Sequence, residues 1–230
     1  MKRGTIVKSI VIGLALVGML AFVGTAQADT ITYALTGHGT AVADLNEWGG
    51  ECDGYEFTTG SSDLIVSWLG FYDAPTPIYE EIEGEMVLVT PGTVGDGLAA
   101  SHQTSIWKVS DGSTVATTLI EPADSLIGSF RGHNIDEPVT LLPNTAYIIA
   151  ANYGGEGDRE RETNDLAGWG INGITINPDE AGHYGGTDGS MPTGEWTTMI
   201  SSTFGYIPEP ATMSLLVLGG LALLRRRRRA

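Results

Sequence analysis

The segment DLIVSWLGFYD, Asp63–Asp73, carries the clearest structural signal in this chain of 230 residues. Between its two aspartates it is rich in β-branched and aromatic residues. Such enrichment is typical of a β-strand. We therefore predict a strand across this segment.

Other segments repeat this signature along the chain. Ile31, Tyr33 and Leu35 alternate with threonine and alanine, which is the period-two pattern of a strand. The further predicted strands are TSIWKV (Thr104–Val109), STVATTLI (Ser113–Ile120), AYIIAANY (Ala146–Tyr153) and TTMISSTFGY (Thr197–Tyr206).

Turn signals separate these segments. They are Asp53-Gly54, Gly95-Asp96-Gly97, Asp111-Gly112, Pro143-Asn144 and Gly154-Gly155. Asp111-Gly112 lies between two predicted strands and indicates a hairpin turn. Patterns for long amphipathic helices are absent from the middle of the chain. Many short strands with regular turns predict an all-β fold, an antiparallel jelly-roll-like β-sandwich.

The N-terminus has the pattern of a secretory signal peptide, residues 1–28. Three basic residues precede an apolar stretch, and Ala26-Gln27-Ala28 supplies the small residues that signal peptidase requires. We expect a signal helix here and cleavage before Asp29. The alternative is a permanent N-terminal anchor. The basic residues are Lys2, Arg3 and Lys8, and the apolar stretch is Ile10–Val23.

The C-terminus, residues 208–230, reads PEPATMSLLVLGGLALLRRRRRA. Ala211–Leu224 predicts a short hydrophobic helix that rises about 21 Å, less than the roughly 30 Å of a bilayer core. Arginine side chains can snorkel and make a temporary insertion possible. By the positive-inside rule the arginines stay in the cytoplasm and the body, residues 29–207, lies outside. They are Arg225, Arg226, Arg227, Arg228 and Arg229.

This tail resembles the PEP-CTERM sorting signal. Pro208, Glu209 and Pro210, the hydrophobic segment and the terminal arginines follow one another in the order of that family. The resemblance implies recognition by an exosortase, a membrane-embedded cysteine transpeptidase-like enzyme, and removal of the tail. It implies a Gram-negative bacterial protein, anchored transiently in the inner membrane and then present at the cell surface or in the extracellular matrix. The alternative is a plain membrane anchor.

The body is strongly acidic. It holds 27 of the 28 acidic residues and 4 of the 12 basic ones, which gives 4 − 27 = −23. Such a charge repels nucleic acid and anionic headgroups and favours cations. Its one cysteine, Cys52, forms no internal disulfide, and we expect it to be buried.

Residues 55–153 resemble a β-sandwich domain of unknown function found in secreted bacterial proteins. That family implies a fold and a location but no activity. Compared with it, residues 74–95 form a longer link, in which Glu81, Glu83 and Glu85 alternate with other residues and predict an edge strand or a hairpin. The matching pieces are Phe57-Thr58, Gly70–Asp73, Asp96–Leu98, Ser101-His102, Ile106-Trp107, Pro138-Val139, Leu141 and Tyr147.

No catalytic or metal-binding pattern emerges from the residues. The four histidines lack metal-ligand spacing. Ser101 and His102 are neighbours on a strand, so their side chains point to opposite faces. We therefore predict neither a catalytic residue nor a required cofactor. Weak calcium binding stays open at three acidic segments, which are Glu51 with Asp53 and Glu56, Gly95–Gly97, and Glu156–Asp165.

Tryptophans are the residues that would stack on a sugar ring. Trp68 and Trp107 lie within apolar strands and are expected in the core. Trp48, Trp169 and Trp196 stand near glycines and are better surface candidates, although a position that plugs the end of the sandwich is equally open for them. The residues favour a non-enzymatic secreted protein that is structural, adhesive or associated with exopolysaccharide. The alternatives are a glycoside hydrolase with two carboxylates and a calcium-stabilised carbohydrate-binding module.

Overall fold

The structure is a computed structural model of the chain. It describes residues 30–37, 45–46, 52–75, 78–82, 84–90, 92–152, 158, 160–162, 166, 169–176, 182–186, 189–196 and 199–208. The predicted signal helix, the hydrophobic helix and the residues from Glu209 onward lie outside these ranges. Across the described ranges no helix is long and apolar enough to cross a membrane.

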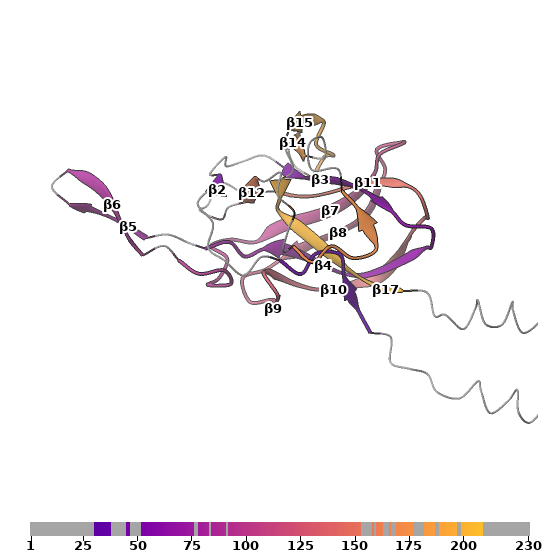
Figure 1. Cartoon of the computed structure of the whole chain (residues 1–230), viewed down its shortest axis with the longest axis horizontal. Coiled ribbons are helices and arrows are strands. Elements are labelled where there is room, and N and C mark those ends of the chain that lie inside the picture. The colour runs from indigo at the N-terminus through magenta and orange to yellow at the C-terminus, as the bar shows by residue number, and fades with distance from the viewer. Residues whose placement is uncertain are drawn as a thin grey trace, which may run out of the picture. The chain divides into compact units, whose positions relative to one another are not determined.

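The chain divides into two units, Met1–Thr30 and Ile31–Ala230, and every described strand belongs to the second. A five-stranded antiparallel sheet forms one layer of this unit (Figure 1). In spatial order it contains β1 (Thr32–Tyr33), β17 (Ser202–Pro208), β4 (Leu64–Tyr72), β10 (Phe130–Leu141) and β9 (Ser125–Ile127).

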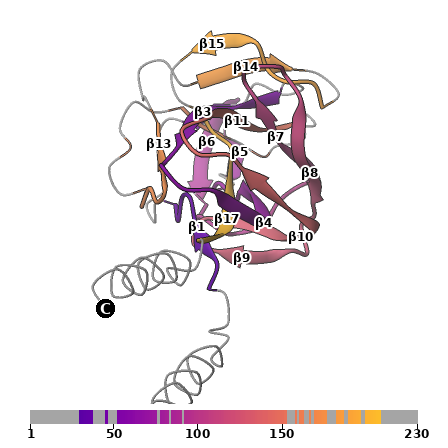
Figure 2. The same ribbon diagram turned by 90° about the vertical axis from the view of Figure 1, so that its right-hand side faces the viewer.

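A seven-stranded antiparallel sheet forms the other layer (Figure 2). Its order is β15 (Gly194–Trp196), β14 (Gly182–Gly186), β3 (Cys52–Thr59), β11 (Ala146–Asn152), β7 (His102–Lys108) and β8 (Thr114–Ile120), and β13 (Ile174–Thr175) also pairs with β3. Two smaller sheets join β16 (Met199–Ile200), β12 (Glu160–Glu162) and β2 (Leu45–Asn46), and β5 (Ile78–Ile82) with β6 (Glu85–Thr90).

The strand order is that of a jelly roll. Numbered in chain order, the principal strands β1, β3, β4, β7, β8, β10, β11 and β17 give the sheets 1-8-3-6 and 2-7-4-5. This is the interleaved arrangement of two Greek keys in two sheets. The prediction of an all-β, antiparallel jelly-roll-like sandwich is confirmed.

Aromatic side chains fill the space between the two sheets. Phe57 of β3 lies with its ring centroid 5.0 Å from that of Phe204 on β17 and 5.9 Å from that of Tyr147 on β11. All three are buried in one hydrophobic cluster. Burying such rings supplies a large share of the free energy that stabilises a sandwich.

The predicted strands are found close to their expected positions, as β4, β7, β8, β11 and β17. The hairpin turn at Asp111-Gly112 is confirmed, since β7 pairs with β8 and Gly112 has a φ of 68°. The turn predicted at Asp53-Gly54 is wrong, because both residues lie inside β3. A side chain at position 54 would collide with the backbone of Ile149 on β11, so glycine permits the close approach of two strands here.

Residues 74–95 contain the expected hairpin. Among the described strands, β5 and β6 pair only with each other. Their apolar side chains Ile82, Val87, Leu88 and Val89 are exposed, as are Glu80, Glu81 and Glu85. The hairpin therefore adds no strand to the two main sheets, and the side chains whose burial the structure describes lie outside the core.

Candidate functional site

The last strand, β17, ends at Pro208, the first residue of the predicted sorting motif. It lies between β1 and β4, with Tyr206 opposite Thr32 on one side and Pro208 opposite Leu64 on the other. Phe204 is fully buried, and its carbonyl accepts a hydrogen bond from the Ala34 amide at 2.8 Å. The strand is therefore internal as far as Tyr206, and Ile207 and Pro208 continue it paired with β4.

Two turns, Gly60–Asp63 and Leu142–Thr145, lie next to the end of β17. We call these two turns together the exit rim. They are joined by a hydrogen bond of 2.8 Å from the Asn144 amide to the Gly60 carbonyl. Asn144 has a φ of 48°, a left-handed conformation that asparagine tolerates in a turn. A hollow of about 280 Å³ beside the rim is lined by Gly60–Leu64, Gly173 and Tyr206.

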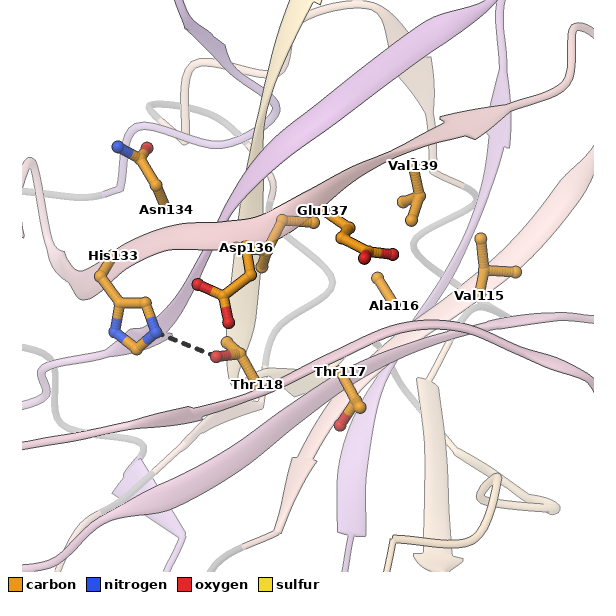
Figure 3. A pocket seen from close by; sticks show the side chains of 10 residues that line it. Val115, Ala116, Thr117, Thr118, His133, Asn134, Asp136, Glu137 and Val139 are labelled. Carbon is orange, nitrogen blue, oxygen red and sulfur yellow. Dashed lines mark hydrogen bonds between the residues drawn. The ribbon is translucent and has the colours of Figure 1, made fainter.

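A groove of about 410 Å³ runs between β8 and β10, where the two sheets meet along one side (Figure 3). Asp136 and Glu137 turn towards it from a bulge in β10, where the register with β4 shifts. His133 lies at one end and shares hydrogen bonds with Thr118 at 2.9 Å and Asp124 at 2.7 Å. Asp136 and Glu137 are both exposed, whereas the general acid of a glycosidase is a carboxyl in an apolar pocket.

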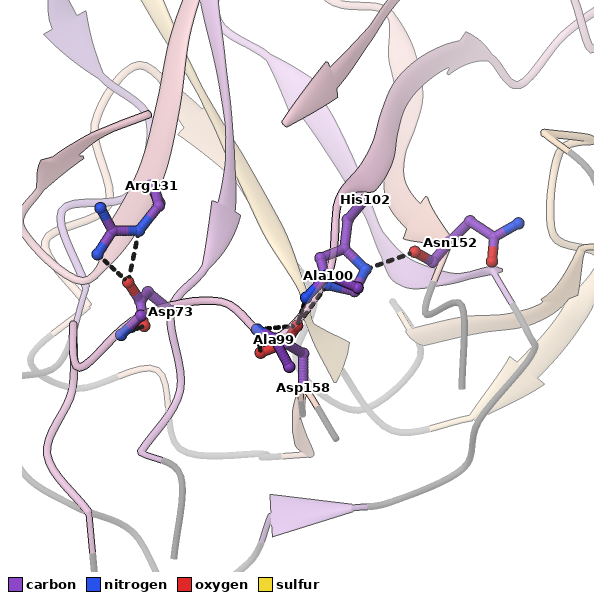
Figure 4. Close-up of polar contacts among 8 residues, drawn as sticks. Asp73, Ala99, Ala100, His102, Arg131, Asn152 and Asp158 are labelled. Atoms are coloured by element: carbon purple, nitrogen blue, oxygen red, sulfur yellow. Dashed lines mark hydrogen bonds and ion pairs between the residues drawn. The ribbon is translucent and has the colours of Figure 1, made fainter. Parts of the chain in front are cut away.

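His102 is the first residue of β7 and lies near Asn152, at the end of β11 away from the exit rim. Figure 4 shows its contacts. Its ring stacks on Phe71 with centroids 4.0 Å apart. Nδ1 lies 2.9 Å from the Asn152 carbonyl and Nε2 lies 2.7 Å from Oδ2 of Asp158. Since both ring nitrogens face oxygen acceptors, neither is available as a general base for a substrate.

Asp158 receives further hydrogen bonds at this position. The Ala99 amide donates to its carboxylate at 2.8 Å and the Ala100 amide donates at 3.1 Å (Figure 4). His102 and Asp158 therefore form a buried, hydrogen-bonded pair, with side chains 1% and 4% exposed. Ser101, by contrast, is exposed, which confirms that it points away from His102.

Asp73 forms a second buried contact nearby. Arg131 donates to its Oδ2 from Nε at 2.9 Å and lies within 2.7 Å through Nη2, and the Gly97 amide donates to Oδ1 at 3.0 Å. Burial raises the pKa of Asp73, while the Gly97 amide and the Arg131 guanidinium oppose that rise. The pair connects β4 with β10 and is completely occupied by structural contacts.

The structure describes only parts of the three acidic segments considered for calcium. Asp53 and Glu56 are three positions apart on β3, so their side chains leave opposite faces. Asp96 accepts a hydrogen bond from the Thr93 amide within its own turn. Within the described part of the chain, no group of three His, Cys, Asp or Glu side chains is arranged to hold a metal. Glu51 and most of Glu156–Asp165 lie outside that part, so weak calcium binding stays a prediction.

The tryptophans considered for stacking on a sugar ring are buried wherever the structure describes their side chains. Trp68 and Trp107 are buried, as expected. Trp169 is also fully buried, packed against Tyr72 and Phe130, so of the two positions left open for it the surface one is excluded. Glycine in the flanking sequence marks a tight turn at Gly170, with a φ of 62°, rather than an exposed loop tip. Trp48 and the side chain of Trp196 lie outside the described residues.

Cys52 is buried, which confirms the expectation for it. Burial, together with the nearby charge of Asp53, raises the pKa of its thiol to about 12. Its partners Trp107, Ile148 and Ala150 form a small apolar cluster. A thiol held neutral in this way is a poor nucleophile.

Comparison with known proteins identifies the tail. A family model described as the PEP-CTERM protein-sorting motif matches residues 207–229. The chain carries a PEP-CTERM sorting signal. Such a motif is recognised by exosortase, and it indicates secretion and sorting to the cell envelope or surface. A search of the curated proteins finds no match.

Of the residues predicted for sorting, the structure places only Pro208, as the last residue of β17. Glu209, Pro210, Arg225–Arg229 and the signal-peptide residues Ala26 and Ala28 lie outside the described ranges. The sequence missed the partnership of His102 with Asp158, because 56 residues separate them and no local pattern connects them.

Proposed function

We propose that this chain is a non-enzymatic secreted protein that exosortase sorts to the cell envelope or extracellular matrix, where its jelly-roll body is structural, adhesive or associated with exopolysaccharide. Signal peptidase cleaves before Asp29, and the hydrophobic tail holds the chain in the inner membrane for a time. Exosortase then acts at Pro208–Pro210 and the body leaves with its fold complete.

One observation carries this proposal, namely the position of the sorting motif directly after the last internal strand. Residues 31–208 contain both sheets of the sandwich, so removal of the tail takes no strand from them. A sorting signal that can be removed without disturbing the domain suits a protein whose final location is outside the cell. The net charge of −23 in the body, 4 − 27, keeps that domain soluble.

The non-enzymatic part of the proposal is supported by the way the acid–base groups are used. Both ring nitrogens of His102 are engaged, Asp73 is paired with Arg131, and the thiol of Cys52 is buried. Groups of these types are common in catalysis, but here each is buried or engaged in contacts within the sandwich.

Sedimentation with the host's own exopolysaccharide tests the role of the body. Protein released from the cell surface is mixed with the purified polymer, and the bound fraction and the polymer length are measured. The proposal predicts that the protein sediments with the polymer and leaves its length unchanged. Release of oligosaccharides would instead show that the protein is an enzyme.

A glycoside hydrolase is the second candidate, because Asp136 and Glu137 face the groove between β8 and β10 (Figure 3). If the protein shortens the polymer, the variants D136N and E137Q must each abolish the activity by orders of magnitude. Persistence of the activity in both variants would exclude this groove as the active site.

A further inference from the structure

The folded sandwich leaves the sorting motif almost no spacer. The family match begins at residue 207, and both Ile207 and Pro208 are paired with β4, opposite Ile65 and Leu64. Only Glu209 and Pro210 then separate the sheet from the apolar segment that starts at Ala211. The first residues of the motif thus belong to the fold.

The length of chain that an enzyme can grip is correspondingly short. Two extended residues span about 7 Å. Tyr206 is buried and paired with both β1 and β4, so fraying of the strand stops there. Even if Ile207 and Pro208 detach, four extended residues reach only about 14 Å from the sheet. An enzyme that binds Pro208–Pro210 must therefore come against the end of the sandwich.

The exit rim is the surface it meets there. Gly60–Asp63 immediately precedes Leu64, the residue opposite Pro208, and Leu142–Thr145 follows Leu141, which is also paired with Leu64. Ser61, Ser62, Leu142 and Asn144 are exposed, and Asp63 is the one charged residue of the rim. The rim is thus nearly uncharged in a body of very high negative charge. Tyr206 of β17 is one of the residues that line the hollow beside it.

We propose that exosortase docks on the exit rim of the folded sandwich, and that Gly60–Asp63 and Leu142–Thr145 are part of what it recognises in this chain. The inference rests on the proposed function, since it concerns the enzyme that removes the tail. It adds that processing depends on the folded body and not on the terminal motif alone.

Bulky substitutions on the rim test the inference in the full chain. In cells that contain exosortase, removal of the tail from the S61W/S62W variant is followed over time by mass spectrometry. We expect it to be about tenfold slower than in the wild type, the effect of losing one good docking contact. The matched control is A123W, at an exposed position in the turn before β9 at the other end of the sandwich, and it is processed at the wild-type rate.

A spacer separates a docking effect from misfolding. Six residues, Gly-Ser-Gly-Ser-Gly-Ser, inserted between Ile207 and Pro208 leave the Pro-Glu-Pro motif intact and add about 20 Å of reach. The insertion restores wild-type processing to S61W/S62W, because the enzyme no longer has to approach the rim. Processing of S61W/S62W at the wild-type rate without the spacer would overturn the inference and leave the proposed function standing. A wild-type chain that keeps its arginines in the presence of exosortase would overturn both.

Crosslinking identifies what lies against the rim. Cys52 is buried, so the S62C variant offers one accessible thiol for a photoreactive probe, with A123C as the control. The inference predicts a crosslink from position 62 to exosortase and none from position 123. Crosslinks from position 62 to lipid alone would mean that the rim faces the membrane, which contradicts docking of the enzyme.

Discussion

Asp73 and Arg131 form the most enclosed ion pair with an arginine in the described part of the structure, with side chains 0% and 15% exposed. The variant D73N keeps the shape but leaves the guanidinium without its counter-charge. Breaking a buried pair in this way costs about 3–5 kcal/mol of unfolding free energy. Urea denaturation measures the loss.

The double variant D73N/R131M is the control for this pair. Replacing both partners removes the unpaired charge, so we expect its unfolding free energy to exceed that of D73N. An unfolding midpoint for D73N equal to that of the wild type would show that the pair adds nothing to stability.

Cys52 provides a pH-dependent prediction at the same scale. Its thiol has a pKa raised to about 12 in the folded chain, against about 8.5 when unfolded. The neutral thiol is favoured by folding, so this contribution to stability is fully present below about pH 8.5 and is lost as the pH rises towards 12.

Alkylation with iodoacetamide checks this prediction. At pH 8 the folded protein stays unmodified, and modification proceeds only in urea concentrations that unfold it. The C52A variant, which has no thiol, gives the background. Rapid modification of the native protein at pH 8 would contradict burial of the side chain.

Among the elements, β17 is the strand on which the body and the tail both depend. A chain of residues 29–208 retains every described strand and is expected to fold with the near-ultraviolet circular dichroism of the wild-type body. A chain of residues 29–201 loses β17 and with it Phe204 from the core, and we expect it to remain unfolded. The F204A variant of the longer chain should lose about 3–5 kcal/mol. Equal folding of the two chains would contradict the internal position of β17.

The β5–β6 hairpin is an element that the sandwich does not need. We expect deletion of residues 76–91 to change the Tm by less than about 4 °C, the shift that about 1 kcal/mol produces in a domain of this size. The reason is that its described apolar side chains are exposed and its strands pair only with each other. Calorimetry measures the change, and a much larger fall would mean that the hairpin supports the core.

The elements also show which parts of the fold are readable from the sequence. Strands with uninterrupted apolar or alternating patterns, such as β4 and β11, were predicted at nearly their observed positions. No pattern predicts β10, since a bulge and the charged pair Asp136-Glu137 break its alternation. β3 was hidden by Asp53-Gly54, because a glycine that lets two strands approach looks the same as a glycine in a turn.

The candidate site also has one part that the sequence predicts and one part that only the fold shows. The sorting tail is a contiguous pattern of proline, apolar and basic residues, so the sequence alone predicts it. The exit rim and the His102–Asp158 pair bring together residues far apart in the chain, and only the folded sandwich makes these contacts. Burial of Trp169 likewise depends on Tyr72 and Phe130, which are distant in sequence.

At the scale of the whole molecule, β1 and β17 are paired at the same end of the sandwich, with Thr32 opposite Tyr206. The mature N-terminus expected at Asp29 is only three residues from β1, and the sorting motif follows β17 directly. In the proposed function, both cleavages therefore fall within a few residues of this pair of strands.

Mass spectrometry of the C-terminal peptide, compared between inner-membrane, surface and medium fractions of the native host, tests the central claim most directly. The account predicts a chain that ends within Pro208–Pro210 outside the inner membrane, and an unprocessed chain in cells without exosortase. A protein that keeps Arg225–Arg229 and stays in the membrane fraction of the wild-type host would contradict it.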